Sequence, residues 1–255
     1  MSELHLIEVP VPGGTAEAHV SRPPSGTGPG VLFVMDAIGV RPQVAAMCDR
    51  IAGWGYVVLA PNVFHREGTV AELAPRGDLR VAEGRQAVMA EAMPRVGRLT
   101  SDLAVADLTA YLTALRGLDG VTGTRVGVTG YCMGARLALR AAGAHPDVVA
   151  ACGAFHGGGL VTDQPDSPHL ALAGARAEFV CGHADHDRSM PPEAVAALGA
   201  TFARHGLTAT NEVYPDAPHG YTMADTSMYQ ERGAERHFQA LRALLARTLG
   251  PAAGG

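Results

Sequence analysis

The stretch from Thr129 to Ala135 reads Thr-Gly-Tyr-Cys-Met-Gly-Ala and follows a short strand-like run, Arg-Val-Gly-Val, at residues 125–128. It places Cys132 at the centre of a Gly-x-nucleophile-x-Gly turn between a strand and a helix, the pattern of a nucleophile elbow. The flanking glycines are small enough to let strand and helix approach closely. A helix expected over residues 133–144 directs its N-terminal N–H groups at the sulfur, which favours the thiolate and stabilises an adjacent oxyanion. The stretch therefore predicts a nucleophilic cysteine on an α/β fold.

Two other interpretations of the same stretch have to be weighed. A lone cysteine at a strand end is usually a small core residue. The glycines also resemble the phosphate-binding turn of a nicotinamide-dependent short-chain dehydrogenase. That turn would lie near the start of the chain, however, and the sequence contains no lysine to complete the Tyr-x-x-x-Lys pair of that family. The nucleophile elbow remains the favoured interpretation.

Apolar runs of strand length alternate with helical patterns along the chain, which predicts a mostly parallel central sheet with helices on both faces. The 255 residues suit a single α/β domain, residues 1–255, with a disordered tail at residues 251–255. Residues 67–98 break the alternation and are interpreted as an excursion over the sheet edge that could form a cap. The expected strands span residues 31–35, 56–60, 125–128, 148–154, 178–181 and 210–214, with helical apolar spacing around residues 108–115, 195–202 and 238–245.

The composition excludes several classes of protein. The formal net charge is −5 and no basic stripe is present, so nucleic-acid binding is not expected. No apolar run approaches the length of a membrane span and the first residues lack signal-peptide features, so we expect no membrane association and a cytoplasmic location. The four cysteines show no metal-ligand spacing, which is consistent with free thiols.

A base and an acid should follow later strands, because reactive groups of open α/β sheets gather beyond the carboxyl ends of the strands. His219 follows the strand expected at residues 210–214, in a loop bounded by proline and glycine, where its imidazole can take the proton of Cys132. Two acids, Asp185 and Asp187, follow the strand expected at residues 178–181. One of them would hold the second ring nitrogen of His219.

At this point the chain resembles the dienelactone hydrolase family of α/β-hydrolases. The resemblance covers residues 28–247 and rests on the segments at residues 35–41, 55–61, 130–134 and 218–221. It implies an α/β-hydrolase fold and hydrolysis of an ester or lactone by a Cys-His-Asp triad. In that family the acid stands four residues before a helix-opening proline, which selects Asp187, four before Pro191, with Asp185 as the alternative.

The resemblance implies three further roles. The oxyanion hole would use the backbone N–H groups of Met133 and Ala37. Asp36 matches the position of an acid that helps to ionise the cysteine, although the best-known members have Glu there. As a strand-end turn residue, Asp36 also has a purely structural interpretation.

One position departs from the family pattern in a way that concerns the substrate. Met223 stands four residues after His219, where relatives that hydrolyse dienelactone have an arginine for the substrate carboxylate. A thioether cannot replace that charge-assisted clamp, so uncharged substrates are expected unless another arginine, Arg85 or Arg41, supplies it. Tyr131, Tyr221 and His156 complete the candidate substrate contacts, and a histidine of a turn without such a role is the alternative for His156.

The expected partner is a small-molecule ester or lactone, no cofactor is required, and the protein is expected to be a monomer or a homodimer. A thioesterase or a general carboxylesterase on the same triad is an alternative. A metal-dependent hydrolase using His183, Asp185 and His186 is disfavoured, because the first histidine of the binuclear zinc pattern is missing and no further ligand cluster is evident. A non-catalytic binding protein would be expected to have lost at least one triad member.

Overall fold

The computed structural model describes residues 3–250, so the tail expected to be disordered lies outside the described residues. An eight-stranded sheet forms the centre, in the order β1-β2-β4-β3-β5-β6-β7-β8. The strands are β1 (Leu6–Val11), β2 (Gly14–Ser21), β3 (Gly28–Val34), β4 (Val57–Pro61), β5 (Val121–Tyr131), β6 (Val149–Phe155), β7 (Glu178–His183) and β8 (Ala209–Val213). All neighbouring strands from β4 to β8 are parallel, whereas β1 and β2 form an antiparallel hairpin whose second strand is also antiparallel to β4.

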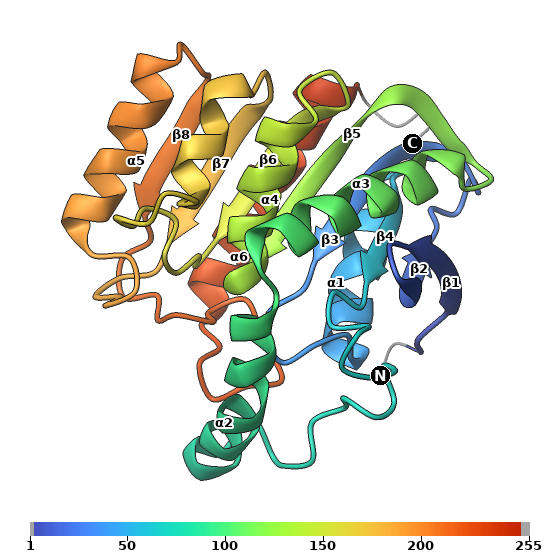
Figure 1. Ribbon diagram of the computed structural model, residues 1–255, viewed down its shortest axis with the longest axis horizontal. Coiled ribbons are helices and arrows are strands. Elements are labelled where there is room, and N and C mark those ends of the chain that lie inside the picture. Colours follow the sequence, from blue (N-terminus) through green and yellow to red (C-terminus); the bar gives the residue numbers. More distant parts are fainter. Residues whose placement is uncertain (1–2, 251–255) are drawn as a thin grey trace.

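Helices cover both faces of this sheet (Figure 1), which confirms the predicted α/β-hydrolase architecture. On one face, α3 (Ser101–Gly117) lies beside α4 (Met133–Ala144), and α5 (Pro192–Arg204) packs against β8. On the other face lie α1 (Pro42–Ala52) and α6 (Glu231–Leu249), which meet where Arg50 pairs with Glu235. A 3₁₀-helix, η1 (Pro168–Gly174), packs against α4.

The excursion over residues 67–98 contains a helix that the sequence pattern does not predict, α2 (Ala82–Arg98). It projects away from the sheet (Figure 1) and buries only Val88 and Ala92 of its apolar residues. Because most of α2 faces solvent, its sequence lacks a clear stripe of apolar residues at helical spacing, and the helix could not be recognised from the sequence. Its N-terminal half nevertheless contributes side chains to the site described below.

The strand register brings the functional loops to one edge of the sheet. Gly130 pairs with Val34, Tyr131 with Phe155, and Phe155 with Gly182. The segments that follow β3, β5, β6 and β7 therefore all start at about the same level, and β8 joins them through the pairing of His183 with Val213. Residues that are far apart in the sequence consequently meet beyond the carboxyl ends of the strands.

Candidate active site

Cys132 forms a strained junction between β5 and α4. Its backbone adopts φ 54° and ψ −118°, and its N–H donates to the Phe155 carbonyl over 3.1 Å. The two motif glycines make this turn possible, because a Cβ at Gly130 would lie 2.1 Å from the Gly134 oxygen and one at Gly134 would lie 2.3 Å from the Val34 oxygen. The first helical N–H groups of α4 therefore sit beside the thiol.

The predicted base and acid form a continuous chain with this cysteine. Nε2 of His219 lies 3.1 Å from Sγ of Cys132, and Nδ1 donates to Oδ2 of Asp187 over 2.6 Å. The other Asp187 oxygen accepts from the backbone N–H and the hydroxyl of Ser189, at 2.9 and 2.6 Å. Asp185 instead accepts from the N–H groups of His186 and Asp216. Of the two candidate acids, Asp187 is thus the one in contact with His219.

The protonation states of the pair follow from these contacts. Burial alone would lower the pKa of His219, but hydrogen bonds to Asp187 and Cys132 outweigh it and raise the pKa to about 10. Burial alone would raise the pKa of Asp187, but the hydrogen bonds from His219 and Ser189 outweigh it and lower the pKa to about 2. The imidazole is therefore cationic at neutral pH, and a cation 3.1 Å from sulfur favours the thiolate.

The backbone N–H groups of Met133 and Ala37, which the resemblance implies as oxyanion donors, belong to segments next to the nucleophile. Met133 opens α4, and Ala37 follows the end of β3, against which Gly134 packs. Neither backbone N–H donates a hydrogen bond to another of the described residues. Ala37 and Cys132 line the same small cavity of about 40 Å³. The two N–H groups are thus available to a substrate oxygen.

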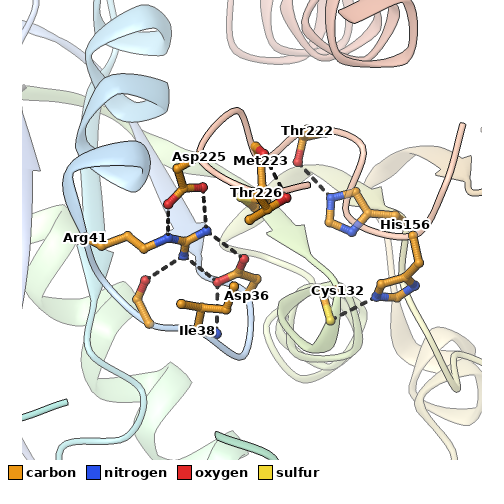
Figure 2. A network of polar contacts seen from close by, with 11 residues as sticks. Asp36, Ile38, Arg41, Cys132, His156, Thr222, Met223, Asp225 and Thr226 are labelled. Atoms are coloured by element: carbon orange, nitrogen blue, oxygen red, sulfur yellow. Dashed lines mark hydrogen bonds and ion pairs between the residues drawn. The ribbon is translucent and has the colours of Figure 1, made fainter. Parts of the chain in front are cut away.

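Asp36 lines that cavity but does not contact the sulfur. Its two oxygens accept from Arg41 at 2.7 and 3.0 Å, and one also accepts from the Ile38 N–H at 3.1 Å. Figure 2 shows the carboxylate directed at the guanidinium and away from Cys132. The Asp36 carboxylate is thus paired with Arg41, and its implied role in ionising Cys132 when substrate binds stays a prediction.

Of the four candidate substrate contacts, His156 and Met223 line the cavity. His156 accepts or donates at Nε2 with the Thr222 hydroxyl over 2.7 Å (Figure 2), and its Nδ1 has no partner among residues 3–250. Burial, reinforced by the nearby charge of His219, holds the pKa of His156 well below its usual range. His156 is therefore a neutral side chain beside the triad.

The two tyrosines lie in the core. Tyr131 is fully buried, stacks on Phe33 at a ring separation of 4.6 Å, and its hydroxyl lies 3.2 Å from Nε2 of His237. Tyr221 is also fully buried and donates to the Gly182 carbonyl over 3.1 Å. Both positions flank the triad in sequence, but neither side chain is among the residues that line the cavity.

Some residues of the site were not predicted from the sequence. Met89 reaches the cavity from α2, together with Arg85, which the sequence had suggested as a substrate contact, and Met228 reaches it from the β8–α6 loop (residues 214–230). The role of Ser189 carried a recognisable signal, since Asp-x-Ser favours a turn in which the carboxylate accepts from the N–H two residues on. The contacts of Arg41 had no such signal, because its second partner, Asp225, is 184 residues away.

The histidines and acid of the disfavoured metal site do not converge. His183 pairs with Asn211 over 2.7 Å, whereas the His186 side chain is 93% exposed. Within residues 3–250, no group of three or more His, Cys, Asp or Glu side chains is arranged to hold a metal ion. The same residues contain no helix long and apolar enough to cross a membrane.

The fold together with a nucleophile elbow places the protein in the α/β-hydrolase superfamily. The family model of the dienelactone hydrolase family matches residues 16–249, and the chain belongs to that family. It is accordingly a hydrolase that acts on ester or lactone bonds.

Known relatives agree with this assignment. Carboxymethylenebutenolidase of Rhodococcus opacus is 28% identical over 84% of this chain and 78% of its own length. A Methylorubrum extorquens protein that carries the same name provisionally is 25% identical over 92% of this chain and 78% of its own. A Klebsiella pneumoniae crystal structure, provisionally described as a dienelactone hydrolase, is similar with a TM-score of 0.81 and 24% identity, over 96% of this chain and 98% of that one.

Proposed function

We propose that the protein hydrolyses small esters or lactones through a covalent acyl-cysteine at Cys132. The observation that carries the proposal is the contact chain from sulfur to imidazole to carboxylate, with separations of 3.1 and 2.6 Å. It supplies a nucleophile, a proton carrier and an orienting group in hydrogen-bond reach of one another.

The reaction follows from these positions in two steps. The Cys132 thiolate adds to the carbonyl carbon, and the oxygen gains negative charge beside the N–H groups of Ala37 and Met133. Collapse of this intermediate breaks the ester C–O bond while the imidazolium of His219 protonates the departing alkoxide. The neutral imidazole then takes a proton from water, whose oxygen attacks the acyl-cysteine and releases the acid. Asp187 holds the imidazole in orientation throughout.

The cavity supports a preference for small, uncharged substrates. Ile38, Met89, Met223 and Met228 give it an apolar lining, and Arg85 is the guanidinium that lines it, in addition to the imidazole of His219. Arg41 is occupied by two carboxylates and is not available to a substrate. A substrate carboxylate in this cavity would therefore lose its hydration and find one partly exposed guanidinium besides the imidazolium of the triad, without the second charge-assisted clamp of an arginine at position 223.

Substitution of the nucleophile tests the proposed chemistry. We expect Cys132→Ala to abolish hydrolysis across a panel of p-nitrophenyl esters, enol lactones and acyl thioesters, and iodoacetamide followed by peptide mapping to label Cys132 faster than the other cysteines. Wild-type rates in Cys132→Ala would reject the acyl-cysteine. A panel dominated by thioesters would favour the thioesterase alternative on the same triad.

The substrate preference needs a separate comparison. We expect kcat/KM for an uncharged lactone to exceed that for dienelactone. Met223→Arg, which adds a partner for the substrate carboxylate, should narrow the difference between the two substrates. The matched variant is Arg85→Gln, which removes the arginine that lines the cavity. A wild-type enzyme that already favours dienelactone would contradict the preference, and loss of that selectivity in Arg85→Gln would identify Arg85 as the clamp.

A further inference from the structure

Arg41 is a fully buried cation with every donor in use. Its side chain is 3% exposed. Nε donates to Asp225 over 2.6 Å, Nη1 to Asp36 and the Gly39 carbonyl over 2.7 and 3.0 Å, and Nη2 to Asp36 and Asp225 over 3.0 and 3.2 Å. A guanidinium has five N–H groups, so none is left for a ligand. Burial of a cation is costly unless it is paired in this way, which indicates a specific task.

The two carboxylates belong to the two loops that frame the cavity. Asp36 lies in the β3–α1 loop (residues 35–41), directly before Ala37. Asp225 lies in the β8–α6 loop, six residues after His219. Figure 2 shows the guanidinium between these two carboxylates, at a distance from His156. Arg41 therefore joins the loop of the proposed oxyanion donor to the loop of the proposed base.

The contacts of Asp36 extend this connection to the backbone around Ala37. Asp36 Oδ1 accepts from the Ile38 N–H over 3.1 Å, and the Asp36 carbonyl accepts from the Gly39 N–H over 3.2 Å. These bonds form a turn with Ala37 inside it. The peptide plane that carries the Ala37 N–H is thus fixed by a carboxylate that Arg41 holds.

We propose that Arg41 is a positioning residue that sets the Ala37 side of the oxyanion hole through Asp36, using Asp225 as its fixed anchor. This inference rests on the proposed acyl-cysteine chemistry. Both carboxylates accept in fork geometry, which a planar guanidinium matches and a lysine ammonium does not. The same pairing keeps the Asp36 charge on Arg41 rather than beside the thiolate.

Two reactions of Cys132 Sγ distinguish whether Arg41 positions the oxyanion hole or activates the thiolate. Ester acylation passes through an oxyanion, whereas alkylation by iodoacetamide displaces iodide at a saturated carbon and forms none. In Arg41→Met we expect single-turnover acylation to fall about tenfold to a hundredfold, as for a misplaced oxyanion donor, and alkylation to change less than about threefold. Arg41→Lys should not restore acylation.

A charge-balanced variant guards against a purely structural effect. Arg41→Met leaves the buried Asp36 carboxylate and the partly exposed Asp225 carboxylate without their cation. The triple variant, which adds Asp36→Asn and Asp225→Asn, removes both charges. We expect the triple variant to recover the Tm lost in Arg41→Met while acylation remains slow. Wild-type acylation in Arg41→Met, a parallel fall in alkylation, or recovery of acylation in the triple variant would each overturn the inference. Hydrolysis that survives Cys132→Ala would instead reject the proposed function itself.

Discussion

At the residue scale, Cys132 occupies a backbone conformation that non-glycine residues rarely adopt, with φ 54°. Such a conformation costs on the order of 1–3 kcal/mol and persists only where the surroundings enforce it. Here the enforcing contacts are the N–H bond to Phe155 and the packing of α4 against β3. The strain projects the sulfur out of the sheet edge towards His219, so the backbone itself orients the nucleophile.

The contact between Asp187 and His219 predicts an asymmetric outcome for the two neighbouring acids. Asp187→Asn should lower kcat on the order of a thousandfold, because the imidazolium loses its orienting carboxylate. Asp185→Asn should cost less than about threefold, since the hydrogen bonds to its carboxylate come from the backbone N–H groups of His186 and Asp216 and not from His219. Steady-state kinetics on one p-nitrophenyl ester decides between them. Equal, small losses would contradict the proposed triad.

The raised pKa of His219 predicts a pH-dependent difference in cysteine reactivity. The imidazolium persists until the pH approaches about 10, so its support of the thiolate is present at neutral pH and lost above that value. His219→Gln should therefore slow alkylation of Cys132 by at least about tenfold near pH 7. The two rates should converge as the pH rises above about 10. A constant ratio at all pH values would argue against the ion pair.

At the scale of elements, the site depends on how closely α4 approaches β3 and β5. The helix begins at Met133 and ends at Ala144, the limits expected from the sequence. Its stripe of buried alanines and leucines packs on the sheet, while the absence of side chains at Gly130 and Gly134 permits the contact at its N-terminus. The close approach therefore couples the stability of the fold to the geometry of the nucleophile.

This coupling makes Gly134→Ala a severe substitution. The Cβ of an alanine at position 134 would lie 2.3 Å from the Val34 carbonyl oxygen, and a backbone atom cannot move aside without a large energetic cost. We expect a loss of about 3 kcal/mol or more in the free energy of unfolding, by analogy with overpacked cores. The control is Gly97→Ala on the exposed end of α2, where a Cβ meets nothing within 4 Å. That change should be neutral or stabilising by up to about 1 kcal/mol. Urea unfolding of both variants provides the comparison.

The sequence pattern predicted the six strands from β3 to β8 and missed β1 and β2. Most of the predicted strands contain buried apolar runs, although β8 has no buried residue. In β1 and the first half of β2, buried and exposed positions are mixed, so no continuous apolar run marks these strands. The sequence of α1 also contains helix signals, namely Pro42 at its start and buried residues at helical spacing, but no helix was predicted there. In the site, the elbow and the chain order of His219 were visible locally. The Arg41 contacts depend on tertiary packing and were not.

At the scale of the whole molecule, the cavity lies between two segments that leave the central α/β layers, α2 and the β8–α6 loop. The segment that leads into α2 is joined to the β8–α6 loop by a hydrogen bond from the Ser227 N–H to the Leu79 carbonyl over 2.9 Å. The cavity of about 40 Å³ is much smaller than the roughly 300–1,000 Å³ of sites that bind drug-sized ligands. Larger substrates therefore require α2 or its methionine side chains to move.

This architecture predicts a steep dependence on acyl chain length. We expect kcat/KM for p-nitrophenyl acetate to exceed that for the octanoate by at least about tenfold, and Met89→Ala to narrow the ratio by enlarging the cavity. Met93→Ala is the matched control, since Met93 lies on the same helix, is 50% exposed and does not line the cavity. A flat chain-length profile would show that α2 does not limit the acyl site.

Because the other three thiols are buried, counting reactive thiols before and after denaturation can measure both the intact sites and the total protein. Cys48, Cys152 and Cys181 are sealed in the core, and burial holds the pKa of the first two well above the usual range and raises that of Cys181 to about 12. Cys132 is the one cysteine of the four that is not buried. A chromogenic disulfide reagent should therefore release one equivalent from each folded molecule with an intact site. Denaturant should then release three more, and the ratio of the two readings measures the active fraction of any preparation.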